Sequence, residues 1–161
     1  MYDSGIIISE AASIEMKDLS LYKNLVKVKG KGGKERFVIF SRYSVHWINR
    51  YLDEVRPGLI KRSRRYLFLN KFGNCITRKG IWIRYKKIAK KAGMVSTPHA
   101  LRHSFASVML KGGAGIEIVQ ALLGHASIET TMIYTHVDEK QLEEAHRKYL
   151  PKIGGPLPFP A

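Results

Sequence analysis

The order of apolar and polar residues in the first half of the chain predicts a small antiparallel sheet and two helices. Apolar and basic side chains alternate within residues 25–29, and the segment Arg-Phe-Val-Ile-Phe at residues 36–40 follows a glycine-rich turn, which together predict a β-hairpin. Apolar residues then recur at helical spacing over residues 45–55 and again over residues 81–89, where Gly93 ends the second helix. A short strand is also predicted at residues 66–69, because a Phe-Gly-Asn turn follows it.

The second half of the chain is predicted to be almost entirely helical. Four helices are expected, and they span residues 98–111, 116–123, 128–134 and 139–149. The fold class is therefore α+β, mostly α-helical with a small antiparallel β-sheet. The chain has 161 residues, of which 45% are hydrophobic, so residues 1–150 are expected to form one domain. Residues 151–161 are expected to be an irregular tail, because proline and glycine cannot continue a helix there.

The charge balance narrows the choice of partners. The chain contains 28 Lys and Arg residues against 13 Asp and Glu, which gives a formal net charge of +15 and a sequence pI of about 10.0. Such a surplus creates a positive potential that attracts a nucleic acid. The outer face of the helix predicted near residues 81–91 is strongly basic, and it serves either DNA contact or solubility. No membrane partner is expected, because the sequence has neither an apolar span of about 20 residues nor a concentrated amphipathic basic helix.

Two further features indicate the compartment. The first residues show no basic segment followed by an apolar run and a cleavage site, so secretion is not indicated. The single cysteine, Cys75, excludes an internal disulfide and is typical of a reducing cytosol. The protein is therefore expected in the cytoplasm, associated with the nucleoid if it acts on DNA.

The candidate chemistry lies in three polar motifs of the helical half. The segment Thr-Pro-His-Ala-Leu-Arg-His, at residues 97–103, places His99 and Arg102 on one face of a predicted helix, where together they can hold one phosphate. Farther along, the motif Leu-Leu-Gly-His ends at His125, and the motif Thr-Met-Ile-Tyr-Thr-His contains Tyr134. The spacing and order of these side chains indicate a phosphoryl-transfer site.

These side chains supply the parts of such a site without a metal ion. A tyrosine phenol is protonated at neutral pH, so Tyr134 needs cations and a proton acceptor nearby before it can attack phosphorus. Arg102 can bind two non-bridging oxygens at once and stabilise the charge on a pentavalent phosphorus. His99 and His125 can supply proton transfers and hydrogen bonds, and Lys31 in the glycine-rich turn can protonate the leaving 5′-oxygen.

With these motifs in this order, the chain resembles the catalytic domain of the tyrosine recombinases, in particular the phage-integrase-like and Xer-type enzymes. The resemblance covers residues 2–150 and depends most on His-x-x-Arg-His, Leu-Leu-Gly-His and Thr-Thr-x-x-Tyr-Thr-His. It implies the tyrosine recombinase catalytic-domain fold and a site-specific recombinase or integrase that cuts and rejoins double-stranded DNA. No cofactor or metal would be needed, because a covalent phosphotyrosyl bond conserves the energy of the phosphodiester.

The resemblance also implies a role for each candidate residue. Tyr134 would form the 3′-phosphotyrosyl bond, Arg102 would hold the scissile phosphate, and Lys31 would act as the general acid. His99 would act as an acid–base partner, and His125 would be a hydrogen-bonding residue at the same phosphate.

The chain departs from the family's pattern near its start. The family usually has Thr-Gly-x-Arg-x-Ser-Glu where this chain reads Ser-Gly-Ile-Ile-Ile-Ser-Glu, so Ile7 stands where the first catalytic arginine is expected. Losing one side chain that binds the phosphate in the transition state lowers the rate of DNA cleavage by about a hundred- to a thousandfold, so the activity of this chain is expected to be reduced. Glu10, at the end of this segment, matches an acidic position that orients neighbouring cations in the family.

The resemblance also implies which other domains and subunits accompany a catalytic domain of this kind. Family members normally carry an N-terminal DNA-clamping domain and a few helices before the Ser-Gly segment, so the chain is expected to lack both. We therefore expect it to bind duplex DNA weakly and with strong salt dependence. The family assembly has four protomers, which implies a homo- or hetero-tetramer on DNA. The helix at residues 139–149 would pack either into a neighbouring subunit or onto its own domain.

Two alternatives stay open at the level of sequence. His99 and His103 have the i, i+4 spacing of zinc ligands, but residue 100 is alanine and no cysteine is close in sequence, so His103 is instead expected to be a structural hydrogen-bond partner. Residues 119–131 resemble two short helices around Gly124, so the chain would alternatively be a non-cleaving, helix-turn-helix-like DNA-binding regulator.

Overall fold

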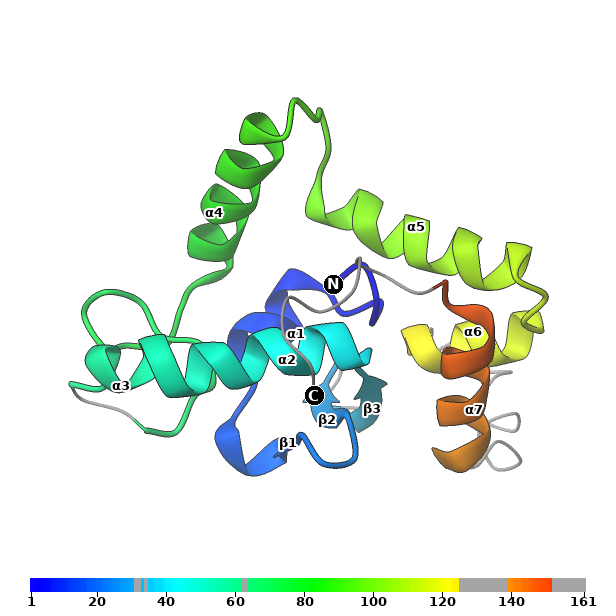
Figure 1. The fold of residues 1–161 in the computed structure, drawn as a ribbon, viewed down its shortest axis with the longest axis horizontal. Coiled ribbons are helices and arrows are strands. Elements are labelled where there is room, and N and C mark those ends of the chain that lie inside the picture. Colours follow the sequence, from blue (N-terminus) through cyan, green and yellow to red (C-terminus); the bar gives the residue numbers. More distant parts are fainter. Residues whose placement is uncertain (31–32, 34, 62–63, 125–138, 152–161) are drawn as a thin grey trace.

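The fold is mostly helical and contains a three-stranded antiparallel sheet, which confirms the expected fold class (Figure 1). A computed structural model describes residues 1–30, 33, 35–61, 64–124 and 139–151. The elements follow in the order α1 Ile8–Ser13, η1 Met16–Asp18, β1 Leu19–Ser20, β2 Leu25–Lys29, β3 Glu35–Ile39, α2 Arg42–Arg50, η3 Tyr51–Val55, α3 Arg56–Leu59, α4 Arg78–Lys91, α5 Pro98–Lys111, α6 Ile116–Leu123 and α7 Glu139–Tyr149. The helix predicted at residues 128–134 and most of the predicted tail, residues 152–161, lie outside the described residues.

The predicted hairpin forms the larger part of the sheet. β2 and β3 pair antiparallel with Val26 opposite Val38 and Lys29 opposite Glu35, and β1 pairs with the other edge of β2. Successive strand residues point to opposite faces, so Val26, Val28 and Val38 all point toward one side and are buried there. They pack with buried residues of the N-terminal segment, α1 and α2 in a first hydrophobic core.

The helices α5, α6 and α7 enclose a second hydrophobic core against the end of β3. Phe105 and Met109 of α5 are fully buried, and burying a side chain of this size contributes roughly 1.5 to 3 kcal/mol. Leu122 of α6 and Leu150, directly after α7, complete this core together with Ile39 of β3. The helix α7 therefore packs onto its own domain, which is one of the two arrangements that the sequence allowed.

The helices that carry the site begin and end where the sequence predicted. The Thr97 hydroxyl accepts a hydrogen bond from the third residue of α5 at 3.2 Å, so it caps this helix, and Gly124 ends α6 at φ +69°. The helix α4 also agrees with the prediction and is followed by Gly93 at φ +67°. The helix predicted at residues 45–55 is longer than expected, because α2, the π-helical turn η3 and α3 are continuous over residues 42–59.

The prediction of a strand at residues 66–69 is wrong. Among the described residues this segment forms only isolated single-residue bridges. The carbonyl oxygens of Tyr66 and Leu67 instead accept hydrogen bonds from the buried guanidinium of Arg56, at 2.9 and 3.2 Å. A ladder needs these carbonyls for a neighbouring strand, so the segment packs its apolar side chains without extending the sheet.

Candidate active site

Arg102 joins three separate parts of the chain. It lies in the second turn of α5 and is half-buried. Its Nη1 donates to the carbonyl of Gly5, and its Nη2 donates to the carbonyl of Leu123, both at 2.7 Å. One guanidinium thereby brings together the N-terminal segment, α5 and the end of α6, which carry the described parts of the site motifs.

Neighbouring charges act on Arg102. Burial lowers the pKa of Arg102, and the positive charge of Arg36 lowers it further, while the Glu10 carboxylate opposes both effects. An arginine keeps its proton at neutral pH despite such a shift, so Arg102 is a cation that can bind a phosphate. Arg36 and Glu10 therefore both act electrostatically on Arg102.

Glu10 connects a second arginine to the same region. This residue is 5% exposed, and its Oε2 accepts hydrogen bonds from Nη2 of Arg36 and from the backbone nitrogen of Ile7, each at 3.0 Å. Glu10 is the third residue of α1, so its bond to Ile7 satisfies a backbone donor at the start of this helix. The Ile7 side chain itself has no group that binds an anion, as the sequence indicated.

Arg36 was not among the predicted site residues. It lies on β3, and its side chain is 12% exposed in the ion pair with Glu10. The same side chain lies against Gly124, where any Cβ would collide with Cδ of Arg36. In the sequence, Arg36 is an arginine near the start of a predicted strand. An arginine that is simply exposed to solvent at a strand end gives the same pattern, so the sequence does not distinguish the two cases.

His99 and His103 lie one turn apart on the exposed side of α5. Their Nε2 atoms are 3.0 Å apart, and their rings meet nearly at right angles, at 86°. One ring donates to the other, so His103 holds His99 in place, and which ring donates depends on the tautomers. Within the described ranges, no group of three or more His, Cys, Asp or Glu side chains is arranged to hold a metal ion.

Three predicted site residues, Lys31, His125 and Tyr134, lie outside the described residues. The structure does describe the strands on either side of Lys31 and the residue that precedes His125. Lys29 and Glu35, which end the two strands of the hairpin on either side of Lys31, form an ion pair at 3.7 Å. Gly124, which contacts Arg36, directly precedes His125 in the chain.

A second set of bonds fixes the N-terminal segment. The Asp3 carboxylate accepts hydrogen bonds from the backbone nitrogen and the hydroxyl of Ser41, at 3.0 and 2.7 Å. The backbone carbonyl of Asp3 accepts a hydrogen bond from Nε2 of the buried His146 at 2.5 Å. Burial lowers the pKa of His146, although this bond and the charge of Asp3 oppose the shift. The neutral ring therefore carries its proton on Nε2, and it ties α7 to the segment that contains Gly5 and Ile7.

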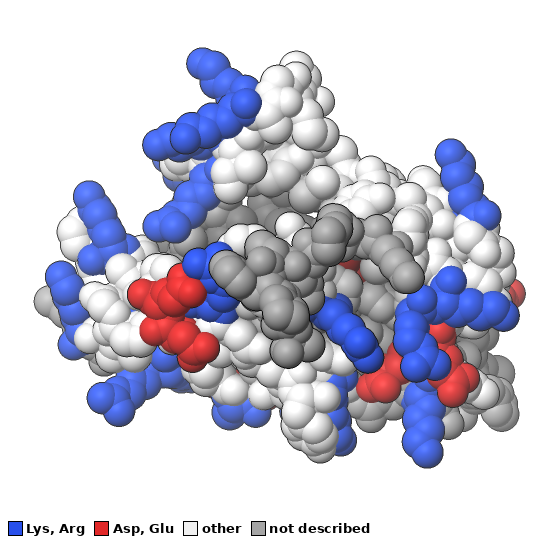
Figure 2. Space-filling model, in the orientation of Figure 1, with Lys and Arg blue, Asp and Glu red and all other residues white. Residues whose placement is uncertain are grey.

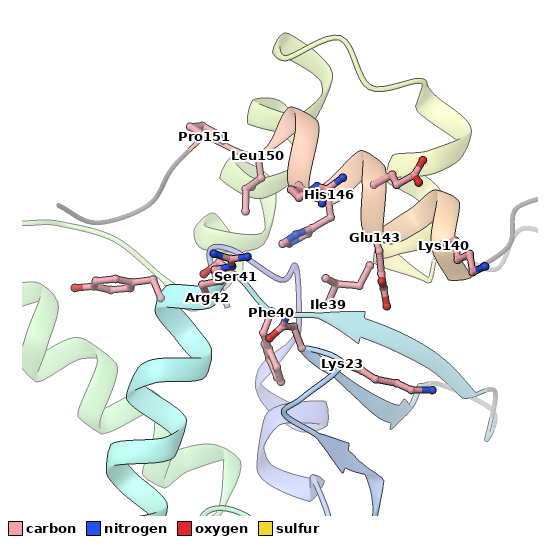
Figure 3. A pocket seen from close by; sticks show the side chains of 14 residues that line it. Lys23, Ile39, Phe40, Ser41, Arg42, Lys140, Glu143, His146, Leu150 and Pro151 are labelled. Carbon is pink, nitrogen blue, oxygen red and sulfur yellow. The ribbon is translucent and has the colours of Figure 1, made fainter. Parts of the chain in front are cut away.

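A cavity of about 630 Å³ lies beside this junction, between α7 and the corner where β3 meets α2 (Figure 3). Ser41 and Arg42 line one side of the cavity, and Glu143 and His146 line the other. None of its lining residues is Arg102, Glu10, Arg36 or His99. The cavity therefore shares no lining residue with the described part of the candidate active site.

The helix α4 carries a strongly basic surface that leads into α5. It contains seven Lys and Arg residues and no acidic residue, namely Arg78, Lys79, Arg84, Lys86, Lys87, Lys90 and Lys91. Figure 2 shows Lys and Arg side chains along this helix, which rises away from the sheet in Figure 1. Within the part of the chain that is described, no helix is both long and apolar enough to span a bilayer.

Comparison with known proteins identifies relatives in sequence and in fold. The model of the phage integrase family matches residues 1–141. The tyrosine recombinase XerD of Lacticaseibacillus casei is 43% identical over 155 residues, which cover 94% of this chain and 53% of the relative. The crystal structure of XerA recombinase matches with a TM-score of 0.70 and 32% identity, over 92% of this chain and 54% of that one. XerH recombinase in a post-cleavage complex with palindromic difH substrate matches with a TM-score of 0.68 and 32% identity, over 89% of this chain and 42% of that one.

These relatives confirm the expected tyrosine recombinase catalytic-domain fold. They are all named as recombinases, so the alternative of a helix-turn-helix-like regulator is not favoured. The chain spans about half the length of the relatives that it matches.

Proposed function

Because the chain belongs to the phage integrase family, we propose that it is the catalytic region of a tyrosine site-specific recombinase. It cuts and rejoins strands of double-stranded DNA through a 3′-phosphotyrosyl intermediate. The observation that carries the proposal is the position of Arg102, whose two hydrogen bonds of 2.7 Å tie the N-terminal Ser-Gly segment to the end of the Leu-Leu-Gly motif. Motifs that are far apart in sequence thereby meet at one cation.

The cleavage step transfers the phosphate from DNA to the protein. The Tyr134 oxygen attacks the scissile phosphorus, His99 accepts the phenol proton, and the bond from phosphorus to the 5′-oxygen breaks. Arg102 binds non-bridging oxygens and offsets the negative charge that grows on them, while His125 donates a hydrogen bond to the same phosphate. Lys31 donates a proton to the leaving 5′-oxygen.

The rejoining step is the reverse reaction with a new strand end. A 5′-hydroxyl attacks the phosphotyrosyl phosphorus while Lys31 accepts its proton, the bond from phosphorus to the Tyr134 oxygen breaks, and His99 returns a proton to the departing phenolate. Each step exchanges one phosphate ester bond for another, so the bond energy is conserved. The reaction as proposed therefore requires neither ATP nor a metal ion or other cofactor.

The proposed partner is double-stranded DNA, and the proposed assembly is a tetramer. The seven cations of α4 and the net charge of +15 support DNA binding, as does the description of XerH in complex with its difH substrate. Exchange between two duplexes requires four strand cuts, which four protomers supply as a homo- or hetero-tetramer. The protein would act in the cytoplasm at the nucleoid, where such DNA is found.

A nicked suicide duplex tests the chemistry. When the strand is nicked just beyond the scissile phosphate, the short cleaved end diffuses away and the covalent adduct accumulates. The full chain is incubated with a pool of nicked duplexes of random sequence, and adducts are separated on a denaturing gel. We expect an adduct with the unchanged chain and none with Tyr134→Phe, which lacks a single oxygen atom.

The control for this test is another tyrosine. Tyr22 is 85% exposed and lies outside the proposed site, so Tyr22→Phe should form as much adduct as the unchanged chain. A regulator that only binds DNA would form no adduct with any of the three proteins, and that outcome would overturn the proposed function.

A further inference from the structure

Two arginines from different elements approach the end of α6. Arg102 of α5 donates to the carbonyl of Leu123 at 2.7 Å. Arg36 of β3 lies against the next residue, Gly124, so closely that the site has no room for a Cβ. The positive charge of Arg36 also lowers the pKa of Arg102, so the two cations repel each other. The two side chains therefore converge on one corner of the molecule.

Arg36 also reaches the segment that lacks the expected arginine. Its Nη2 donates to Oε2 of Glu10 at 3.0 Å, and the same oxygen accepts a hydrogen bond from the backbone nitrogen of Ile7 at 3.0 Å. A single carboxylate oxygen thus separates the guanidinium of Arg36 from the backbone of residue 7. Arg102 binds the same segment two residues earlier, through the carbonyl of Gly5.

The charges of these three side chains suit a phosphodiester. Arg36 and Arg102 carry two positive charges and Glu10 carries one negative charge, which leaves one positive charge among the three. A phosphodiester carries one negative charge, and nucleophilic attack adds further negative charge to its non-bridging oxygens. An arginine has five N–H donors in a planar fork, so Arg36 can keep its bond to Glu10 and still donate to a phosphate oxygen.

We propose that Arg36 binds a non-bridging oxygen of the scissile phosphate together with Arg102, in place of the arginine that position 7 lacks. The inference rests on the proposed function of the site and adds one residue to it. Arg36 transfers no proton in this role, because its guanidinium only binds the phosphate and offsets the charge of the transition state.

A methylphosphonate at the scissile position distinguishes phosphate binding from a purely structural role. In this analogue a methyl group replaces one non-bridging oxygen, so the group is uncharged and its transition state carries one negative charge fewer. The variant Arg36→Gln removes the cation but keeps a donor for Glu10. We expect its rate of adduct formation to fall about a hundredfold or more on nicked phosphate DNA. On the methylphosphonate, the same variant should lose less than about tenfold relative to the unchanged chain.

The control variant is Arg65→Gln. Arg65 also pairs with a glutamate, Glu15, at 2.6 Å, but its side chain is 62% exposed. Its replacement should change the rate on neither substrate, and melting curves establish that both variants are folded. If Arg36→Gln loses the same factor on both substrates, the inference is wrong, because a structural arginine does not respond to the charge of the phosphate.

The single variant Ile7→Arg gives a test that does not depend on how well Arg36→Gln folds, and it should raise the rate of adduct formation less than about tenfold while Arg36 is present. Where Arg36→Gln is folded, adding Ile7→Arg to it should restore most of the lost rate. If Ile7→Arg raises the rate of adduct formation by about a hundredfold or more with Arg36 present, then Arg36 does not replace the missing arginine at the phosphate, and the inference is wrong. If the unchanged chain forms no adduct on either substrate, the proposed function fails and this inference fails with it.

Discussion

At the scale of single residues, the site is organised around one buried carboxylate. Glu10 accepts hydrogen bonds from the backbone nitrogen of Ile7 and from Arg36, so it both caps the start of α1 and orients the Arg36 side chain. A buried charge is stable only when it is paired and hydrogen-bonded, and Glu10 meets both conditions. The stability of the N-terminal segment is therefore coupled to the geometry of the site.

This coupling predicts a large effect of a small change. We expect Glu10→Gln to lower the free energy of unfolding by about 3 kcal/mol, because the Arg36 side chain, 12% exposed, loses its counter-charge in a buried position. Urea denaturation at neutral pH measures the loss. In the control Glu15→Gln, the partner Arg65 is 62% exposed, so a much smaller loss is expected. Equal losses in the two variants would show that burial adds nothing to the Glu10 ion pair.

At the scale of elements, the sequence predicted the helices whose local signals agree. The bounds of α5 and α6 followed from capping residues and apolar periodicity in the same places. The strand expected at residues 66–69 does not form, because two of its carbonyl oxygens accept hydrogen bonds from Arg56, a contact that the local sequence pattern does not show. The helix α1 was not predicted, since six residues are too few to show a helical period.

The residues of the candidate site likewise include some that the sequence identified and one that it did not. His99 and Arg102 could be identified from sequence, because their spacing puts both on one short stretch of α5. Arg36 could not, because its importance depends on Glu10, which is 26 residues away in sequence. The roles of Lys31, His125 and Tyr134 stay predictions that the adduct experiment tests.

The end of α6 offers a test of packing within an element. Gly124 and Gly93 both follow helices with left-handed φ angles, at +69° and +67°. A Cβ at Gly93 would meet nothing within 4 Å, whereas one at Gly124 would collide with Arg36. We expect Gly93→Ala to lower the free energy of unfolding by about 1 to 2 kcal/mol through backbone strain alone. Gly124→Ala should lose more, because it must also displace Arg36.

The two glycine variants should also differ in activity. Only Gly124→Ala should slow adduct formation on the nicked duplex, since only that change moves an arginine of the site. Urea denaturation and the adduct assay are run on both proteins. Equal losses of stability would contradict the close contact between Gly124 and Arg36.

At the scale of the whole molecule, the positive charge is unevenly distributed. The net charge is +15, and α4 alone holds seven cations without an acidic residue. In Figure 2 most of the acidic side chains in view lie near η3 and α7 instead. Because α4 leads directly into α5, a polyanion attracted to α4 would approach the helix that carries His99 and Arg102.

This distribution predicts which lysines set the salt dependence of DNA binding. Each phosphate contact releases counterions, so the logarithm of the association constant falls with the logarithm of salt concentration by about 0.9 per contact. We expect the double variant Lys87→Gln and Lys90→Gln, which changes two exposed residues of α4, to reduce this slope by about 2 for every duplex sequence. The control, Lys23→Gln with Lys71→Gln, removes the same charge from exposed positions outside α4 and should leave the slope almost unchanged. Fluorescence anisotropy of a labelled duplex over a salt series measures both. Equal changes would mean that binding follows net charge alone, and α4 would then not be the surface that contacts DNA.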